Sequence, residues 1–370
     1  MFCIKTVANI ERSELSKNNV VIENNAYDRI VYFSKMCAIT NCMSYNQLQE
    51  NITFFNGGCP SHLKFCSDIN SNKAANNTYI ESIILAKDHE LGTGYIAIDH
   101  MKRVIILAFR GSHTRWDWYH DFLLYGASYQ PASQKLYQEK IKKGEVKECI
   151  DCKVHAGFNG FLKTLHVQFM ERLENIFKNY TDYSLVITGH SLGAAVAVLA
   201  GIEFKLRGLD PTIITYAQPK IFNSNMIEWI NDLFEIKSLD KNNRDKGYLN
   251  LTNGYYRIVH ENDYITDLPP YFRHAGIQVD INKVLLPHQV SDISYNGLDY
   301  YYSTFEKHSK KNNDTLALIK ITNINKNTIQ RETSINFHQE SKLWESLPDD
   351  WLHLYEHRNY FIQINECDFI

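Results

Sequence analysis

The stretch LVITGHSLGAAVAVL, residues 185–199, decides the fold of this chain. It starts with an apolar, β-branched run that predicts a strand, and it ends with an alanine- and leucine-rich run that predicts a helix. Between them stands Gly189-His190-Ser191-Leu192-Gly193, which fits the pattern G-x-S-x-G. We interpret it as a sharp turn that exposes the serine hydroxyl above a sheet, with glycines where larger side chains would clash. The alternative is a plain strand-to-helix turn closed by glycines.

The segments on either side of this stretch alternate between strand and helix patterns. Arg103–Phe109 is almost entirely apolar, as in a strand buried on both faces, and residues 158–179 have apolar residues along one side of a helix. This alternation predicts a mostly parallel central sheet flanked by helices. Together with the G-x-S-x-G turn, it predicts an α/β-hydrolase fold. Further strands are predicted at Tyr95–Ile98, Thr212–Tyr216, Tyr255–Val259 and Ile277–Val284, and further helices at 26–45, 191–207, 223–236 and 351–361.

The chain of 370 residues is long enough for one large domain. Residues 1–25 are polar and are predicted to form an N-terminal extension, and residues 26–370 a single hydrolase domain. Residues 46–80 are rich in Asn, Ser and Gly and predict a loop. Residues 288–335 mix Asn, Lys, Ser and Tyr, and we expect them to be an insertion in that domain.

Composition excludes several classes of function. The net charge is -3 and no long Lys/Arg run occurs, so the sequence gives no support for nucleic-acid binding. No stretch approaches the roughly 20 apolar residues of a membrane-spanning helix, so no transmembrane segment is predicted. Cys149 and Cys152 form a lone C-x-x-C without the second pair that a zinc site needs, and neither a metal nor a cofactor is implied.

A serine nucleophile needs a base, and the base needs an orienting carboxylate. In hydrolases of this type the chain order is Ser, Asp or Glu, then His. Asp263 is the best candidate carboxylate because it follows the strand Tyr255–Val259, at the sheet edge where α/β proteins build their sites. Glu261 and Asp267 are weaker rivals. Residue chemistry alone does not choose the base among the downstream histidines, and His190 is expected to be a packing residue. The candidates are His274, His288, His308, His338, His353 and His357.

The sequence resembles the fungal triacylglycerol lipases of the class 3 lipase family. The resemblance covers roughly residues 90–275, and its motifs occur in the family's order. They are Ile105–Trp118 (IILAFRGSHTRWDW), Val154–Phe158 (VHAGF), Val186–Leu199 (VITGHSLGAAVAVL), Thr215–Lys220 (TYAQPK) and Tyr256–Pro270 (YRIVHENDYITDLPP).

This resemblance implies a catalytic triad of Ser191, Asp263 and His357. The family's catalytic histidine stands shortly before a Tyr-Phe pair, and His357-Arg358-Asn359-Tyr360-Phe361 looks like that segment. His353, about one helical turn earlier, is the runner-up. The resemblance also implies that the oxyanion of the tetrahedral intermediate is held by the backbone N–H groups of Ser112 and Leu192.

Residues His113–Phe122 correspond to the family's lid, a short helix that covers the site and moves aside at a lipid surface. Trp118 matches the lid tryptophan of the family, and Trp116 is a second aromatic residue there. Transient contact with a lipid interface is therefore expected. Because this segment also carries two aspartates, the alternative is a helix that simply packs on the sheet.

Some of the eight cysteines match family positions. The resemblance implies the pairs Cys37–Cys367, Cys59–Cys66 and Cys149–Cys152, whereas proximity in sequence favours Cys37 with Cys42. Disulfides favour a secreted or lumenal protein, although the N-terminus lacks a convincing signal peptide and leaves a cytoplasmic location as the alternative. The glycosylation sequons point weakly the same way; they lie at Asn51, Asn76, Asn179, Asn250 and Asn313.

These features predict a serine acyl-ester hydrolase, with triacylglycerol or related acylglycerols as its substrates. One alternative is an esterase for non-lipid esters, because feruloyl esterases share the family. Another, from a different class, is a catalytically inactive lipase-like binding protein, against which the complete set of Ser, Asp and His stands.

Overall fold

The computed structural model describes residues 20–43, 47–85, 94–111, 126–298 and 351–369. Their main feature is an eight-stranded sheet with the order β1-β2-β3-β6-β7-β8-β9-β10. The strands from β3 to β9 run parallel, and antiparallel strands flank them at both edges. The bounds are Thr78–Ile84 (β1), Gly94–Asp99 (β2), Val104–Phe109 (β3), Ser184–His190 (β6), Thr212–Tyr216 (β7), Gly254–His260 (β8), Ile277–Ile281 (β9) and Ile293–Gly297 (β10).

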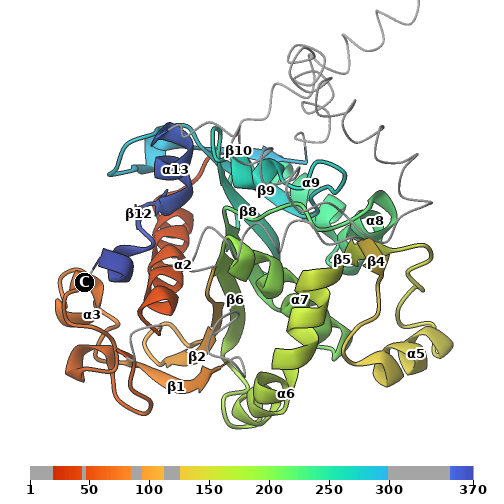
Figure 1. The fold of residues 1–370 in the computed structure, drawn as a ribbon, viewed down its shortest axis with the longest axis horizontal. Coiled ribbons are helices and arrows are strands. Elements are labelled where there is room, and N and C mark those ends of the chain that lie inside the picture. Colours follow the sequence, from red (N-terminus) through yellow and green to blue (C-terminus); the bar gives the residue numbers. More distant parts are fainter. Residues whose placement is uncertain (1–19, 44–46, 86–93, 112–125, 299–350, 370) are drawn as a thin grey trace, which may run out of the picture.

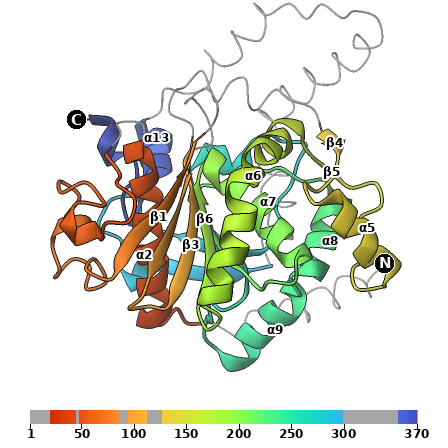
Figure 2. The same ribbon diagram turned by 90° about the horizontal axis from the view of Figure 1, so that it is seen from below.

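Helices cover both faces of this sheet. Helix α2 (Asn24–Cys42) packs on one face, and α6 (Ala156–Asn179) and α7 (Leu192–Leu206) lie on the other (Figure 2). The predicted α/β architecture is therefore present. The remaining α-helices described before the C-terminal segment are α3 (Lys64–Ser67), α5 (Gln134–Lys142), α8 (Ser224–Leu233) and α9 (Ile236–Lys246). A small ribbon pairs β4 (Gly126–Ser128) with β5 (Lys153–His155).

Strand β6 and helix α7 both lie in the core. All of β6 except Ser184 is buried, and so is all of α7 except Lys205. Burying each large aliphatic side chain stabilises the fold by about 1.5–3 kcal/mol, so this strand and this helix are firmly packed. A turn between two such elements is held rigidly in place.

The C-terminal segment lies along α2 (Figure 1). It comprises α13 (Trp351–Arg358), β11 (Asn359–Tyr360), β12 (Ile362–Gln363) and η5 (Glu366–Phe369). The Ser34 hydroxyl donates to the Tyr360 carbonyl, and Asn41 Nδ2 donates to the Ile364 carbonyl at 2.7 Å. A disulfide between Cys42 and Cys367 closes the contact at its far end. The first described helix therefore holds the end of the chain in position.

The predicted pairs Cys59–Cys66 and Cys149–Cys152 are confirmed, but the predicted Cys37–Cys367 pair is wrong. Cys367 bonds to Cys42, and Cys37 is a buried free thiol whose Sγ lies 3.2 Å from Thr188 Oγ1 on β6. Five residues advance a helix by about 7.5 Å and about 140°, so Cys37 faces the sheet while Cys42 faces the C-terminal segment. The same separation excludes the alternative Cys37–Cys42 bond.

Several predicted boundaries also need correction. Val21 pairs with Tyr248, so the N-terminal extension does not reach residue 25. Strand β1 lies partly in the predicted 46–80 loop, and β10 lies in the predicted 288–335 insertion. Both are edge strands in which polar residues interrupt the apolar run, so their sequences did not predict strands. The predicted helix 223–236 ends at Leu233, and the polar helix α9 follows after Glu235, whose φ is 52°. Helix α5 was not predicted because it has one buried residue.

Within the described ranges, no helix is both long and apolar enough to cross a membrane.

We predict that removing the Cys42–Cys367 bond destabilises the protein more than removing Cys149–Cys152. The first joins residues 325 positions apart and the second residues 3 apart, and a longer loop restricts the unfolded chain more strongly. The double variant Cys42→Ser/Cys367→Ser should lose about 2–5 kcal/mol of unfolding free energy in denaturant titrations. Equal losses in the matched variant Cys149→Ser/Cys152→Ser would contradict this account.

Candidate active site

Ser191 occupies a strained turn at the junction of β6 and α7. Its φ of 56° and ψ of -124° lie outside the conformations that residues other than glycine normally adopt. A Cβ on Gly189 would collide with the Gly193 carbonyl, and a Cβ on Gly193 would collide with the Phe109 carbonyl. Both glycines of the pentapeptide are therefore required by close backbone approach, as the sequence predicted.

The structure brings Ser191, Asp263 and His357 together. His357 Nε2 lies 3.1 Å from Ser191 Oγ, and its Nδ1 lies 2.9 and 3.0 Å from the two carboxylate oxygens of Asp263. All three residues are at least 96 % buried. A hydroxyl in hydrogen-bond reach of an imidazole that is itself held by a carboxylate is the arrangement that activates a serine nucleophile.

Asp263 follows β8 and begins the short helix η3 (Tyr264–Asp267). Its Oδ1 accepts a hydrogen bond from the Ile265 N–H at 3.1 Å, and its Oδ2 accepts one from the Tyr360 hydroxyl at 2.7 Å. Burial alone would raise the pKa of this carboxyl, but the neighbouring His357 and the hydrogen bonds from His357 and Tyr360 hold the pKa of Asp263 below its ordinary value. The carboxylate is therefore ionised at neutral pH.

His190, inside the pentapeptide, supports the base instead of acting as one. Its Nε2 lies 2.7 Å from the backbone carbonyl of His357, and because a carbonyl only accepts, that nitrogen carries the proton. Burial, with the nearby His357 ring, lowers the pKa of His190 to about 3, so the ring is neutral. His190 was predicted to be a packing residue. In the structure it also holds the backbone that carries His357.

The expected oxyanion site is described only in part. Leu192 is the first residue of α7, where backbone N–H groups have no acceptor within the helix. The loop after β3 reaches the nucleophile, because a Cβ on Gly111 would lie 3.4 Å from the Ser191 Cβ. Ser112, Trp116 and Trp118 lie outside the described residues.

Several of the rival residues have other partners. Asp267 is exposed and pairs with Lys220 at 3.0 Å, and Glu261 is also exposed. His274 Nε2 donates to the Thr266 carbonyl at 2.7 Å, and His288 Nδ1 accepts from the Phe361 N–H at 3.2 Å. The His353 side chain, His308 and His338 lie outside the described residues. Among the described histidines, His357 is the one that meets both Ser191 and Asp263.

Sequence reasoning did not find Tyr360 as part of the site. The residue served only as a marker of the segment that carries His357. Its role requires knowing that β11 passes beside Asp263, which lies 97 residues earlier. A tyrosine three residues after the base was therefore the only available signal.

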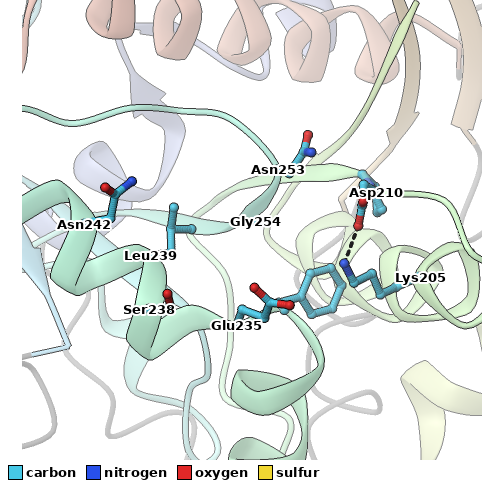
Figure 3. Close-up of a pocket in the computed structure, with 10 residues that line it drawn as sticks. Lys205, Asp210, Glu235, Ser238, Leu239, Asn242, Asn253 and Gly254 are labelled. Carbon is cyan, nitrogen blue, oxygen red and sulfur yellow. Dashed lines mark hydrogen bonds and ion pairs between the residues drawn. The ribbon is translucent and has the colours of Figure 1, made fainter. Parts of the chain in front are cut away.

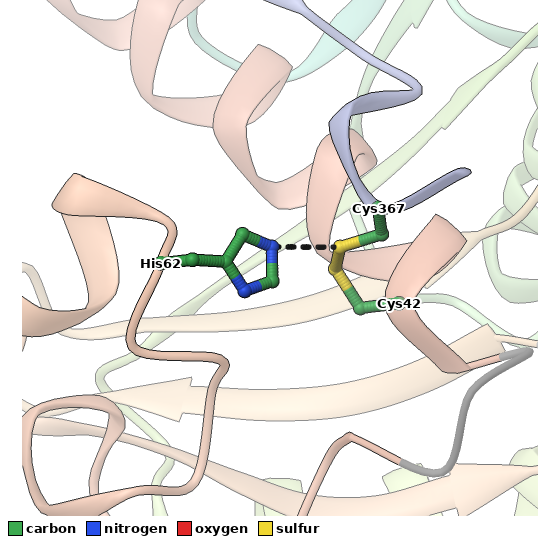
Figure 4. A group of neighbouring side chains, drawn as sticks. All are labelled: Cys42, His62 and Cys367. Atoms are coloured by element: carbon green, nitrogen blue, oxygen red, sulfur yellow. Dashed lines mark hydrogen bonds between the residues drawn. A yellow bond between two sulfur atoms is a disulfide. The ribbon is translucent and has the colours of Figure 1, made fainter. Parts of the chain in front are cut away.

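Two other groups of residues could suggest a binding site. Cys42, His62 and Cys367 are close enough to suggest a metal site, but the two sulfurs are bonded to each other and offer no thiolate (Figure 4). A cavity of about 400 Å³ is lined by residues that include Gly254, the first residue of β8 (Figure 3). Ser191 follows the carboxyl end of β6, which runs parallel to β7 and β8, so the cavity lies at the opposite end of these strands. Its lining includes the ion pair of Lys205 with Asp210, together with Glu235, Ser238, Asn242 and Asn253.

Comparisons with known proteins point in one direction. The family model described as Lipase (class 3) matches residues 106–272. The chain is 43 % identical over 350 residues to the "Putative lipase LIH1" of Saccharomyces cerevisiae, covering 95 % of this chain and 97 % of that one. It is 28 % identical to the secreted mono- and diacylglycerol lipase A of Penicillium cyclopium, over 48 % of this chain and 46 % of that one. The crystal structure of Lip2 lipase from Yarrowia lipolytica is similar with a TM-score of 0.61 at 23 % identity, covering 75 % of this chain and 87 % of that one.

We predict that Tyr360→Phe lowers the stability of the folded protein by an amount that depends on pH. The substitution removes a hydrogen bond to a charged group, which contributes about 1.5–3 kcal/mol. Because the folded-state pKa of Asp263 is depressed, its ionisation stabilises the protein above the ordinary aspartate pKa and this contribution is lost as pH falls through the folded-state value. Tyr360→Phe raises that folded-state pKa, so its loss of melting temperature should be largest near neutral pH and smaller in acid. A pH-independent loss would contradict this explanation.

Proposed function

The chain belongs to the class 3 lipase family and is a lipase-type serine hydrolase acting on carboxylic esters, and we propose that its substrates are acylglycerols, cleaved through an acyl-enzyme on Ser191. The observation that carries this proposal is the placement of the His357 ring between Ser191 Oγ and the Asp263 carboxylate. The fold similarity to Lip2 lipase agrees with it but does not itself argue for a substrate.

In the proposed reaction, Ser191 Oγ attacks the ester carbonyl while His357 Nε2 accepts the hydroxyl proton. Asp263 keeps the proton of His357 on Nδ1 and stabilises the imidazolium. The same Nε2 proton then passes to the departing alcohol, which leaves an acyl ester on Ser191. A water molecule then attacks that ester while its proton passes to His357 Nε2, and the same proton returns to Ser191 Oγ as the fatty acid leaves.

The oxyanion of each tetrahedral intermediate would sit at the amino end of α7. The Leu192 N–H and the positive end of the helix dipole both favour negative charge there. We propose the Ser112 N–H as the second donor, since Gly111 places its chain beside Ser191. Loss of one such donor typically lowers kcat by about 10²–10³.

Acylglycerols are proposed for two reasons. The relative from Penicillium cyclopium is named a mono- and diacylglycerol lipase. In addition, the sequence of the expected lid, with Trp116 and Trp118, is aromatic enough to meet a lipid surface. We propose contact of that segment with a lipid interface during turnover.

We also propose that the protein is secreted or resides in the lumen of the endomembrane system. The disulfides among the described cysteines support this, because such bonds persist in oxidising compartments. The sequon asparagines Asn51, Asn76 and Asn179 are exposed, whereas Asn250 is half-buried.

The experiment that tests the proposed function compares emulsified acylglycerols with soluble aryl esters. Emulsified acylglycerols should be turned over faster, and Ser191→Ala should lower kcat on both by roughly 10⁶. Ser184→Ala, at the exposed start of the same strand, is the matched control and should keep wild-type activity. Faster turnover of soluble esters would favour a non-lipid esterase, and no turnover of either would favour an inactive binding protein.

For localisation, we expect the natively expressed protein to carry N-linked glycans at Asn51, Asn76 and Asn179. Treatment with peptide N-glycosidase should lower its mass, and Asn→Gln variants at these positions should each remove one step of that change. A native protein with unmodified asparagines and reduced cysteines would place it in the cytoplasm instead.

A further inference from the structure

A second buried carboxylate lies beside the proposed triad. Glu356 is only 1 % exposed and immediately precedes His357. Its Oε2 accepts a hydrogen bond from the backbone N–H of Asn262 at 2.8 Å, and its Oε1 accepts one from Asn262 Nδ2 at 3.0 Å. Asn262 immediately precedes Asp263, so the residues next to the base and next to the carboxylate are joined by two hydrogen bonds.

We propose that Glu356 is a positioning residue, which fixes the distance between Asp263 and His357 by clamping Asn262; this inference rests on the proposed function. Glu356 and Asn262 together are called the clamp below. Glu356 accepts two hydrogen bonds from Asn262 and none from Ser191. It therefore acts through the backbone that joins Glu356 to His357 and the backbone that joins Asn262 to Asp263.

The chemistry of the clamp requires a carboxylate. Two donors on Asn262 converge on one side chain, and a carboxylate offers an acceptor oxygen to each of them. A glutamine would offer one oxygen and turn an N–H group toward the other donor. Burying a charged carboxylate is costly unless hydrogen bonds compensate it, and an ionised acceptor makes each of these bonds stronger.

The surroundings of Glu356 do not replace these bonds. His260 Nδ1 is 3.7 Å from Glu356 Oε2, which is too far for a hydrogen bond. His260 Nε2 is instead within 2.9 Å of the Asn359 carbonyl, and burial together with the neighbouring His288 lowers the pKa of His260 to about 4. A neutral imidazole therefore adjoins the clamp, and the clamp bonds come from Asn262.

The clamp is needed because the two segments are distant in sequence. Glu356 and Asn262 are 94 residues apart, as are His357 and Asp263. His190 holds the His357 carbonyl, and Tyr360 holds the Asp263 carboxylate, each from one side. The clamp ties the two backbones directly, at the positions next to both side chains. A misplacement of about 1 Å at such a site can lower the rate by about 10²-fold.

The test uses a reversal of the clamp's polarity. Glu356→Gln removes one acceptor, and Asn262→Asp sets two carboxylates against each other, so each should lower kcat by roughly 10–100-fold with KM within about twofold. In the double variant Glu356→Gln/Asn262→Asp, the new side-chain amide would donate to the new carboxylate, and the amide oxygen would accept the backbone N–H. The double variant should therefore recover kcat to within about threefold of wild type.

Glu203→Gln is the matched control. Glu203 is equally buried, and its carboxylate accepts the backbone N–H groups of Ala132 and Ser133. It lies 12 residues after Ser191 on α7, about 18 Å along the helix. The Glu203→Gln substitution should lower the melting temperature but leave kcat unchanged. All rates are measured well below the melting temperature of each variant.

A second readout does not depend on hydrolysis. The Nδ1 proton of His357, shared with Asp263, should give a low-field proton NMR signal in the wild type. That signal should shift or broaden in Glu356→Gln and return in the double variant. Recovery of both kcat and the signal supports the clamp. Single variants with wild-type kcat and signal, a double variant no better than the worse single one, or an equal kcat loss in Glu203→Gln would overturn it. If the wild type fails to hydrolyse esters while the signal changes as expected, the proposed function fails and the clamp stands.

Discussion

Ser191 holds a strained backbone conformation with a positive φ, and such a conformation costs about 1–3 kcal/mol in a residue other than glycine. The cost is offset by the packing of β6 and α7 on either side and by the hydrogen bond from the Ser191 N–H to the Tyr216 carbonyl at 3.0 Å. In return, the side chain is aimed away from the sheet and toward His357. The two glycines of the turn are the local consequence of this geometry, because any Cβ there meets backbone atoms.

The rest of the structure brings distant segments to that turn. Asp263 arrives at the end of β8, and His357 arrives on the C-terminal segment, 166 residues after Ser191. That segment is supported by α2, which it meets through hydrogen bonds and the Cys42–Cys367 disulfide. His190 contributes from within the turn itself, because it binds the backbone of His357. The contacts that anchor the C-terminal segment therefore also position His357, the proposed base.

The sequence predicted the parts of this arrangement that depend on local chemistry. The turn at Ser191 was visible because its glycines and its flanking strand and helix are contiguous, and Asp263 was visible because it follows a strand of the parallel sheet. His357 could not be separated from the other histidines by residue chemistry, and only a resemblance to a family selected it. Cys42 and Tyr360 were missed because their partners are set by tertiary packing: α2 turns Cys37 toward the sheet, and β11 passes beside Asp263.

We propose that Ser191, His357 and Asp263 act as one unit. The most direct measurement is covalent labelling by a fluorophosphonate, with the adduct located by peptide mass spectrometry and its rate measured in wild type and Asp263→Asn. We expect one adduct per chain, on Ser191, and labelling slowed by roughly 10⁴-fold in the variant because His357 loses its orienting carboxylate. An adduct on another residue, or equal rates in the two proteins, would contradict it.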